Sequence, residues 1–199
     1  MITDHRQRIR DLESILETDL PPPPPAHYRQ APIPDLDLVA AVARRRPNWH
    51  FVFIGDVAVQ TGDAGSLNNV HFLGPRGYDE LPGYCRQLDA AMIPFKVNEL
   101  TRSVNPIKLR EYLAAGLGVV STPLPEVRGF NGLVEIAAGP DEFAAAVERI
   151  LRTGDRKRRE RMDAVRGESW PRKLEAICGR LMSRGTDPPA TREASRCAC

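Results

Sequence analysis

The chain has 199 residues, of which 42% are apolar and 27% charged, and its formal net charge is +2. This length supports one well-cored globular domain, and so small a net charge gives no field that would favour nucleic acid as a partner. No apolar run approaches the roughly 20 residues that span a bilayer, and the N-terminus lacks a signal-peptide core. The four cysteines show no paired metal-ligand spacing, so we expect a reduced, cytoplasmic chain without a metal site.

The first 34 residues predict a short helix and a linker. Between Ile2 and Thr18, apolar residues recur at helical spacing among charged ones. Five consecutive prolines follow at 21–25; they fix φ and lack N–H donors, which favours a stiff polyproline segment. We interpret this segment as a linker, since that use is commoner than recognition by an SH3-type domain.

From residue 35 onward, helical and strand patterns alternate. The strand patterns are short, continuous apolar runs, which are typical of parallel strands buried on both faces. They predict an α/β fold with a Rossmann-like parallel sheet flanked by helices, a domain over 35–183 and a polar, disordered tail over 184–199. The predicted helices are 35–46, 78–88, 106–115, 140–152, 154–166 and 170–183, and the predicted strands are 50–55, 70–74, 89–95, 118–122 and 133–137.

The helix predicted at 106–115 has clear boundaries and a polar face. Asn105 suits the N-cap and Gly116 suits a left-handed stop after the last turn. Lys108 and Glu111 are three residues apart and therefore neighbours on one face. One interpretation is a surface ion pair; the other is a site in which the carboxylate accepts ribose hydroxyls while Lys108 and the helix N–H groups hold a diphosphate.

Two stretches around this helix resemble a known family. "NVHFLGPRGYDELPGYCRQLDAAMIPF" and "NPIKLREYLAAGLGVVSTPLPEV" are similar to the nucleotide-sugar-binding half of GT-B glycosyltransferases of the group 1 type, and the similarity runs from about Asp35 to Leu181. The resemblance implies a C-terminal-type donor domain that binds a nucleoside-diphosphate sugar. It also implies glycosyl transfer to a hydroxyl acceptor in bacterial surface polysaccharide or glycolipid synthesis, with no cofactor beyond the donor.

The resemblance also assigns residues. Glu111 matches the family's ribose-binding glutamate, and the segment Ser103, Val104, Asn105 to Lys108 matches the loop and helix start beside the donor phosphates. Arg102 is a further cation near this loop, and Trp170 matches an aromatic residue near the closing helix. Ser103 stands where many relatives carry a second glutamate, and Glu99 is out of register with that position.

Two further departures from the family concern whole elements of the fold. "AHYRQAPIPD" stands where the family has its first strand and Gly-containing loop, so we expect that strand to be lost. The acceptor-binding half has no counterpart in this sequence, and its catalytic residues are therefore unknown. We expect that the isolated chain does not transfer sugar.

Three functions stay open. The first is a glycosyltransferase donor half; the second is a truncated or degenerate nucleotide-binding domain without turnover, or one chain of a split enzyme that needs an acceptor-domain protein. The third is an unrelated phosphate-binding module. The basic segment Arg156–Arg161 is a candidate for contact with an anionic membrane at its inner face, although solvated helix faces also carry such charges. His50 and His71 are expected to be ordinary strand histidines.

Overall fold

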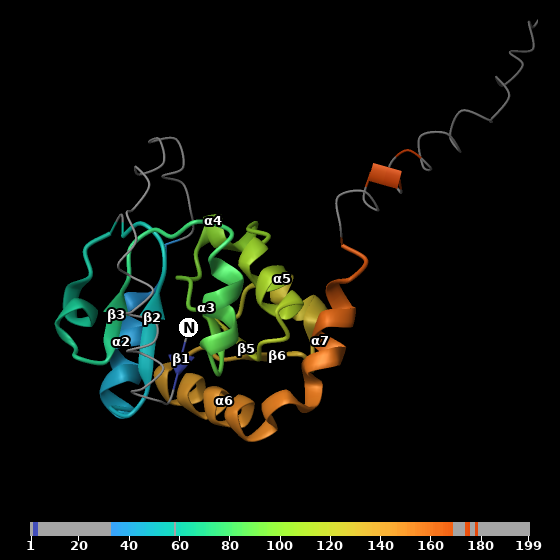
Figure 1. Ribbon diagram of the computed structural model, residues 1–199. Helices are drawn as coiled ribbons and strands as arrows, with labels where there is room; N and C mark the ends of the chain where they lie inside the picture. Colours follow the sequence, from blue (N-terminus) through green and yellow to red (C-terminus); the bar gives the residue numbers. More distant parts are fainter. Residues whose placement is uncertain (1, 4–32, 58, 169–173, 176–177, 179–199) are drawn as a thin grey trace, which may run out of the picture. The chain divides into compact units, whose positions relative to one another are not determined.

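A computed structural model describes residues 2–3, 33–57, 59–168, 174–175 and 178 (Figure 1). The chain divides into a compact unit, Met1–Val165, and a second unit, Arg166–Cys199, and each is treated by itself. Both sheets and the candidate site belong to the first unit. Among the helices of the described ranges, none is both long and apolar enough to cross a lipid bilayer.

The first unit begins its regular part with a helix packed on two parallel strands. The Asp35 carboxylate accepts a hydrogen bond from the Leu38 N–H at 3.1 Å and so caps the amino end of this helix. Phe51 of one strand pairs with Val70 of the next in parallel register. The elements are α2 (Leu36–Arg45), β2 (His50–Phe53), the short 3-10 helix η3 (Gly62–Ser66) and β3 (Val70–Phe72).

The alternation of helices and strands then continues to the end of the unit. The elements are α3 (Leu81–Gln87), β4 (Ala91–Ile93), α4 (Glu99–Arg102), α5 (Ile107–Ala114), β5 (Val119–Ser121), η4 (Pro125–Phe130), β6 (Val134–Ile136), α6 (Pro140–Thr153), η5 (Gly154–Lys157) and α7 (Arg158–Val165). Strands β4, β5 and β6 form a second parallel sheet in that order. Each predicted strand is present, and each lies inside its predicted range.

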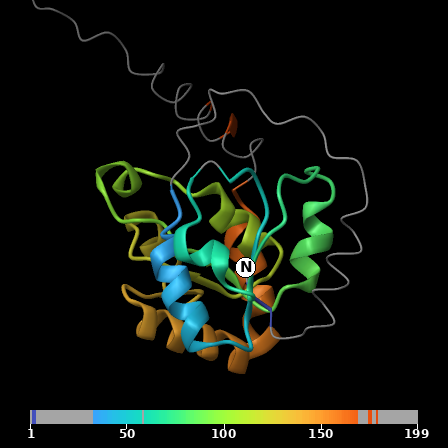
Figure 2. The same cartoon turned by 90° about the vertical axis from the view of Figure 1, so that its left-hand side faces the viewer.

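Helices cover both faces of the strands, so the predicted α/β, Rossmann-like fold is confirmed. Phe51 points to a core cluster shared with α2 and α6, while the next residue, Val52, points to a cluster shared with α3 and α5. Figures 1 and 2 show α6 along one side of the strands and α3 and α5 along another. Because successive strand residues point to opposite faces, both must be apolar, which explains the continuous apolar runs in the sequence.

The sheet is interrupted where the family's first strand was expected to be lost. The described strands form two sheets, in the orders β1-β2-β3 and β4-β5-β6. Strand β1 (Ile2–Thr3) pairs antiparallel with the beginning of β2, through Thr3 opposite His50. In the part of the chain that the structure describes, no parallel strand joins β2 to β4.

Several predictions differ from the structure or fall outside it. The helix predicted from Ile2 to Thr18 is wrong at its first two residues, which pair as β1, and its remainder lies outside the described residues. The helix predicted at 154–166 begins as the 3-10 turn η5, because Gly154 has a φ of +54° that ends α6 and changes the chain's direction. The proline-rich linker, most of the helix predicted at 170–183 with Trp170, and the 184–199 tail lie outside the described residues, so the predicted domain boundaries stay predictions.

The close packing of α6 on β5 gives a first prediction. A Cβ built on Gly118 would lie 2.3 Å from Ile150 Cγ2, so Gly118→Ala forces the α6 side chain out of position in the core. We expect a loss of about 1–3 kcal/mol in the free energy of unfolding, the usual cost of overpacking. Gly129→Ala is the matched control, because a Cβ there meets nothing within 4 Å. Urea denaturation of both variants checks this, and equal midpoints would contradict it.

Candidate functional site

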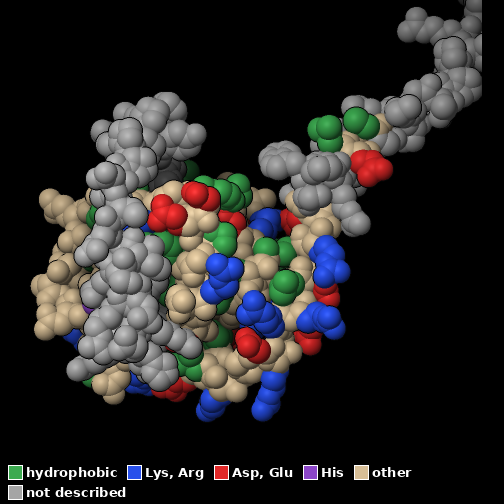
Figure 3. Space-filling model, in the orientation of Figure 1, with side chains coloured by type: hydrophobic (Ala, Val, Ile, Leu, Met, Phe, Trp, Pro, Cys, Tyr) green, Lys and Arg blue, Asp and Glu red, His purple; other side chains and the backbone are tan. Residues whose placement is uncertain are grey.

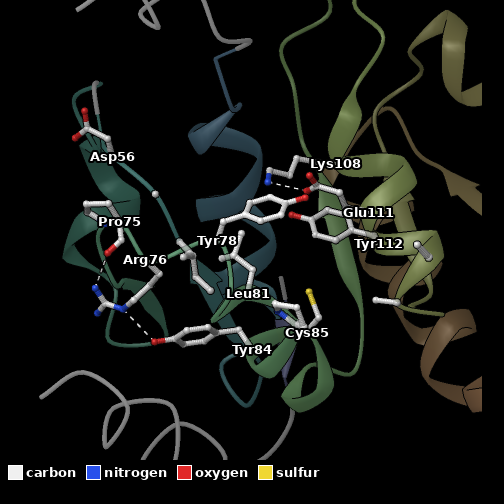
Figure 4. A pocket seen from close by; sticks show the side chains of 15 residues that line it. Asp56, Pro75, Arg76, Tyr78, Leu81, Tyr84, Cys85, Lys108, Glu111 and Tyr112 are labelled. Atoms are coloured by element: carbon white, nitrogen blue, oxygen red, sulfur yellow. Dashed lines mark hydrogen bonds and ion pairs between the residues drawn. The ribbon is translucent and has the colours of Figure 1, made fainter. Parts of the chain in front are cut away.

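A cavity of about 630 Å³ opens between helices α3 and α5 and the turns that follow β2 and β3 (Figure 4). The turns leave the carboxyl ends of parallel strands, which is where open α/β sheets bind ligands. The wall is largely apolar, with a few charged and aromatic side chains. It is formed by Ile54, Gly55, Asp56, Pro75, Arg76, Tyr78, Leu81, Pro82, Tyr84, Cys85, Lys108, Glu111, Tyr112, Ala114 and Ala115.

Helix α5 brings the predicted pair Lys108 and Glu111 into this wall. Lys108 Nζ lies 2.7 Å from Glu111 Oε2, and the two side chains are 49% and 30% exposed. Leu109 and Leu113 on the other face of the helix are completely buried and fix its rotation. Since the pair is exposed, it adds only a few tenths of a kcal/mol to stability, and both charged groups remain accessible from the cavity.

The carboxyl end of α5 is held firmly. Gly116 has a φ of +78°, as the predicted left-handed stop requires. Its N–H donates to the Leu113 C=O at 2.9 Å, and the Leu117 N–H donates to the Tyr112 C=O at 3.0 Å, which together make a Schellman motif. Arg161 of α7 is buried and donates from Nη1 to the Gly116 C=O at 3.2 Å.

The amino end of α5 differs from the prediction. Asn105 was expected to cap the helix, but Pro106 occupies the cap position and no side chain caps the end. The Asn105 carboxamide oxygen instead accepts a hydrogen bond from Arg110 Nη1. The carboxamide oxygen therefore binds a side chain of α5 and not the backbone at the start of the helix, so the predicted cap is wrong.

The other predicted site residues do not line the cavity. Arg102 ends α4, and Ser103, Val104 and Asn105 form the connection to α5. Arg102, Ser103 and Asn105 are exposed, and Val104 is half-buried. The structure thus brings Lys108 and Glu111 together in the cavity wall, whereas the residues of the loop before them do not line the cavity.

The opposite wall contains residues that sequence reasoning missed. Arg76 Nε donates to Tyr84 Oη at 3.0 Å, and its Nη1 donates to the Pro75 C=O at 2.7 Å. Tyr78, 76% exposed, extends from the same turn toward α5 (Figure 4). Asp56 stands at the turn after β2. Their common signal is position, since each follows the carboxyl end of a parallel strand or belongs to the helix after it.

Two cavity side chains have raised pKa values. Burial raises the pKa of the half-buried Cys85 thiol; the Glu111 carboxylate raises it further, and Lys108 opposes that effect. Burial also raises the pKa of the Tyr112 hydroxyl, with smaller contributions from Cys85 and Glu111. Both groups are therefore protonated at neutral pH, and the charged side chains that line the cavity are Asp56, Arg76, Lys108 and Glu111.

The two strand histidines lie apart from the cavity, as expected. His50 Nδ1 and His71 Nε2 are 3.0 Å apart, on neighbouring strands, with their rings stacked at a centroid distance of 5.2 Å. Neither lines the 630 Å³ cavity. We assign them no role in the site.

Comparison with known proteins identifies the family. The family model described as "Glycosyl transferases group 1" matches residues 36–153, more than half of the chain. This chain belongs to the group 1 glycosyltransferase family. The matched region contains both sheets from β2 onward and every residue that lines the cavity.

One curated relative adds detail. The chain is 33% identical over 147 residues to the Bacillus subtilis (strain 168) protein named "Putative teichuronic acid biosynthesis glycosyltransferase TuaH". The match covers 68% of this chain but only 37% of that relative. Glycosyl transfer is thus the chemistry of the family, and the chain spans little more than a third of the relative's length.

The electrostatics of the cavity can be tested on Cys85. Only the thiolate reacts with iodoacetamide, so a raised pKa keeps the reaction slow at pH 8. Glu111→Gln removes a carboxylate that raises this pKa and leaves Lys108 to lower it, so alkylation of Cys85 should become faster, by roughly twofold or more. Peptide mass spectrometry measures the rate. Glu99→Gln, an exposed change on α4, should leave it unaltered, and equal rates in all three proteins would contradict the assignment.

Proposed function

We propose that this chain is the donor-binding part of a glycosyltransferase and binds a nucleoside-diphosphate sugar in the 630 Å³ cavity. The observation that carries the proposal is the position of Glu111 and Lys108, side by side in the cavity wall at the carboxyl edge of the strands. A carboxylate can accept hydrogen bonds from two neighbouring ribose hydroxyls, and an ammonium group can neutralise a phosphate. Membership of the group 1 family supports the same substrate class.

In the proposed reaction, a hydroxyl of the acceptor attacks the anomeric carbon of the sugar. The bond from that carbon to the nucleoside diphosphate breaks, its electrons go to the diphosphate, and the hydroxyl proton passes to a base. Negative charge on the leaving diphosphate then increases, and cations placed beside it lower the barrier. Lys108 lies in the cavity for this role, and Arg102 and the Ser103–Asn105 loop are proposed to approach the phosphates from the edge.

The acceptor side of the reaction is proposed from the relative. The name of the Bacillus subtilis protein refers to teichuronic acid, and we propose a polysaccharide or glycolipid acceptor for this chain also. Because the match covers 37% of that relative, an acceptor-binding half, in the same or another polypeptide, is part of the proposal. The inverting or retaining outcome depends on that half.

The basic segment Arg156–Arg161, proposed to contact a membrane, has fewer exposed positive charges than its sequence suggests. Lys157 Nζ donates to the Gly132 C=O at 2.7 Å, and Arg161 is buried against α5. Figure 3 shows basic and acidic side chains interspersed over the visible face. A membrane-side location therefore stays a prediction from sequence, with Arg156, Arg158 and Arg159 as its exposed basic residues.

A second candidate function is donor binding without turnover. The observation that favours it is the interruption of the sheet between β2 and β4. A small cavity lies at this interruption, and Lys108 and Tyr112 line both this cavity and the donor cavity. A gap there leaves the donor-binding wall less rigid than a continuous sheet would. The two candidates differ in catalysis, and they share the donor site.

The role of Glu111 gives a direct prediction. Glu111→Ala should weaken nucleotide binding by roughly 1.5–3 kcal/mol, the range for hydrogen bonds to a charged group, and leave the fold intact. Glu99→Ala is the matched control, since Glu99 is an exposed glutamate on α4 that does not line the cavity. Calorimetric titration with UDP-, GDP- and dTDP-sugars measures the affinities. Equal affinity of the parent and Glu111→Ala for the donor that binds would contradict the proposed ribose contact.

The two candidate functions are separated by a turnover assay. We expect that the purified chain binds a donor but gives no glycosyl product with membrane-extracted acceptors, because transfer requires a second wall that positions the acceptor hydroxyl. Product that appears only after an acceptor-domain protein is added supports a split enzyme. Turnover by the chain alone, abolished in Glu111→Ala, would show that the expectation is wrong and that these residues suffice.

A further inference from the structure

An exposed aromatic ring stands at the 630 Å³ cavity. Tyr78 lines this cavity, yet it is 76% exposed, more than any other large hydrophobic residue in the part of the chain that the structure describes. Figure 4 shows the side chain extending from the turn after β3 toward Glu111 and Tyr112 on α5. Because the ring is so exposed, it adds little to the core, and its faces are accessible to a ligand in the cavity.

The turn that carries Tyr78 is held in place by hydrogen bonds. The Glu80 N–H donates to the Gly77 C=O at 3.1 Å, which closes a β-turn with Tyr78 at its second position. The Gly77 N–H donates in return to Glu80 Oε1 at 3.1 Å. Directly before the turn, Arg76 Nε donates to Tyr84 Oη of α3 at 3.0 Å. The backbone that positions the ring is therefore fixed before a ligand binds, which lowers the entropic cost of binding.

The two walls of the cavity differ in chemistry. On α5, Lys108 and Glu111 present a cation and a carboxylate. The wall opposite takes mostly apolar side chains from the turn after β3 and the start of α3, namely Pro75, Tyr78, Leu81 and Pro82. Arg76 of that turn already donates from two of its nitrogens to protein acceptors. The phosphates and hydroxyls of a ligand therefore suit the α5 wall, and a flat, apolar part suits the wall of Tyr78.

The covalent order of a nucleoside diphosphate matches this division. The proposed contacts assign the diphosphate to Lys108 and the ribose to Glu111, which are about 4.5 Å apart along the axis of α5. Since the base is bonded to the ribose, a ribose held by Glu111 keeps the base close to that residue. Tyr78 extends toward Glu111 from the opposite wall (Figure 4), so its ring is available to the base.

We propose that Tyr78 stacks on the nucleobase of the donor, an inference that rests on the proposed function of the cavity. A base–aromatic stack requires no particular hydrogen-bonding pattern, because every base has a π-face. Tyr78 therefore adds affinity for each base and leaves the choice among bases to other groups of the cavity. The stack uses the ring and not the phenol hydroxyl, so phenylalanine is expected to replace tyrosine at this position.

The test measures binding to the full chain by calorimetric titration with UDP, GDP and dTDP and with the corresponding nucleotide sugars. Tyr78→Ala should weaken the nucleoside diphosphate that binds the parent by roughly 5- to 150-fold, the loss expected for one base–aromatic stack. Tyr78→Phe, which keeps the ring, should bind within about twofold of the parent. Leu100→Ala is the matched control, because Leu100 is 55% exposed on α4 and does not line the cavity.

The comparison of two ligands shows which part of the donor Tyr78 contacts. A nucleoside diphosphate and its nucleotide sugar share the base, so Tyr78→Ala should weaken both by the same factor. A loss confined to the nucleotide sugar would place Tyr78 against the sugar and overturn the proposal. Circular dichroism checks the fold of each variant, and the exposure of Tyr78 predicts that Tyr78→Ala remains folded.

Tyr78→Trp gives an independent spectroscopic test. An indole stacked on a base loses fluorescence, so the nucleoside diphosphate should quench the emission of this variant and saturate where the calorimetric signal saturates. The parent contains Trp49 and Trp170 and is the control for their emission. Quenching no greater than that of the parent would contradict the stack.

Failure of this inference is distinguishable from failure of the proposed function. Binding that Glu111→Ala weakens and Tyr78→Ala leaves unchanged would overturn the stack on Tyr78 and keep the donor site. If the parent binds none of the three nucleoside diphosphates and none of their sugars, the proposed function is wrong, and the inference is overturned with it.

Discussion

The structure depends on strands that are buried on both faces. Phe51 and Val52 are neighbours in the chain, yet one packs with α2 and α6 and the other with α3 and α5. The same division at Met92 and Ile93 forces helices onto both sides of the strand layer. Since parallel strands start at one edge of the layer and finish at the other, their carboxyl ends meet at one edge, and the candidate donor cavity lies there.

Helix α5 connects this core to the site. Its buried Leu109 and Leu113 fix which face turns outward, and the helical repeat then places Lys108 and Glu111 in the cavity wall. The Schellman turn at Gly116 and the buried guanidinium of Arg161 hold the far end of the helix. Burial lowers the pKa of Arg161, with Asp155 and Glu160 acting in the opposite direction, so this contact uses a charge that is costly to bury. Rigid support of this kind suits a helix whose exposed face binds a ligand.

The interrupted sheet and the donor cavity share a boundary. Lys108 and Tyr112 line both the 630 Å³ cavity and a smaller cavity of about 150 Å³ between β2 and β4, so the two cavities lie on neighbouring sides of α5.

The sequence by itself determined the alternation of elements, the buried strands, the left-handed stop at Gly116 and the pairing of Lys108 with Glu111, because these follow from local periodicity and backbone conformation. It failed at Asn105, whose carboxamide binds Arg110, since no local rule chooses between two hydrogen-bond partners. Arg76, Tyr78 and Tyr84 became site candidates only when the fold brought the turn after β3 opposite α5. The pairing of Ile2–Thr3 with β2 was likewise decided by tertiary structure, because contacts between residues nearly 50 positions apart leave no mark in local spacing.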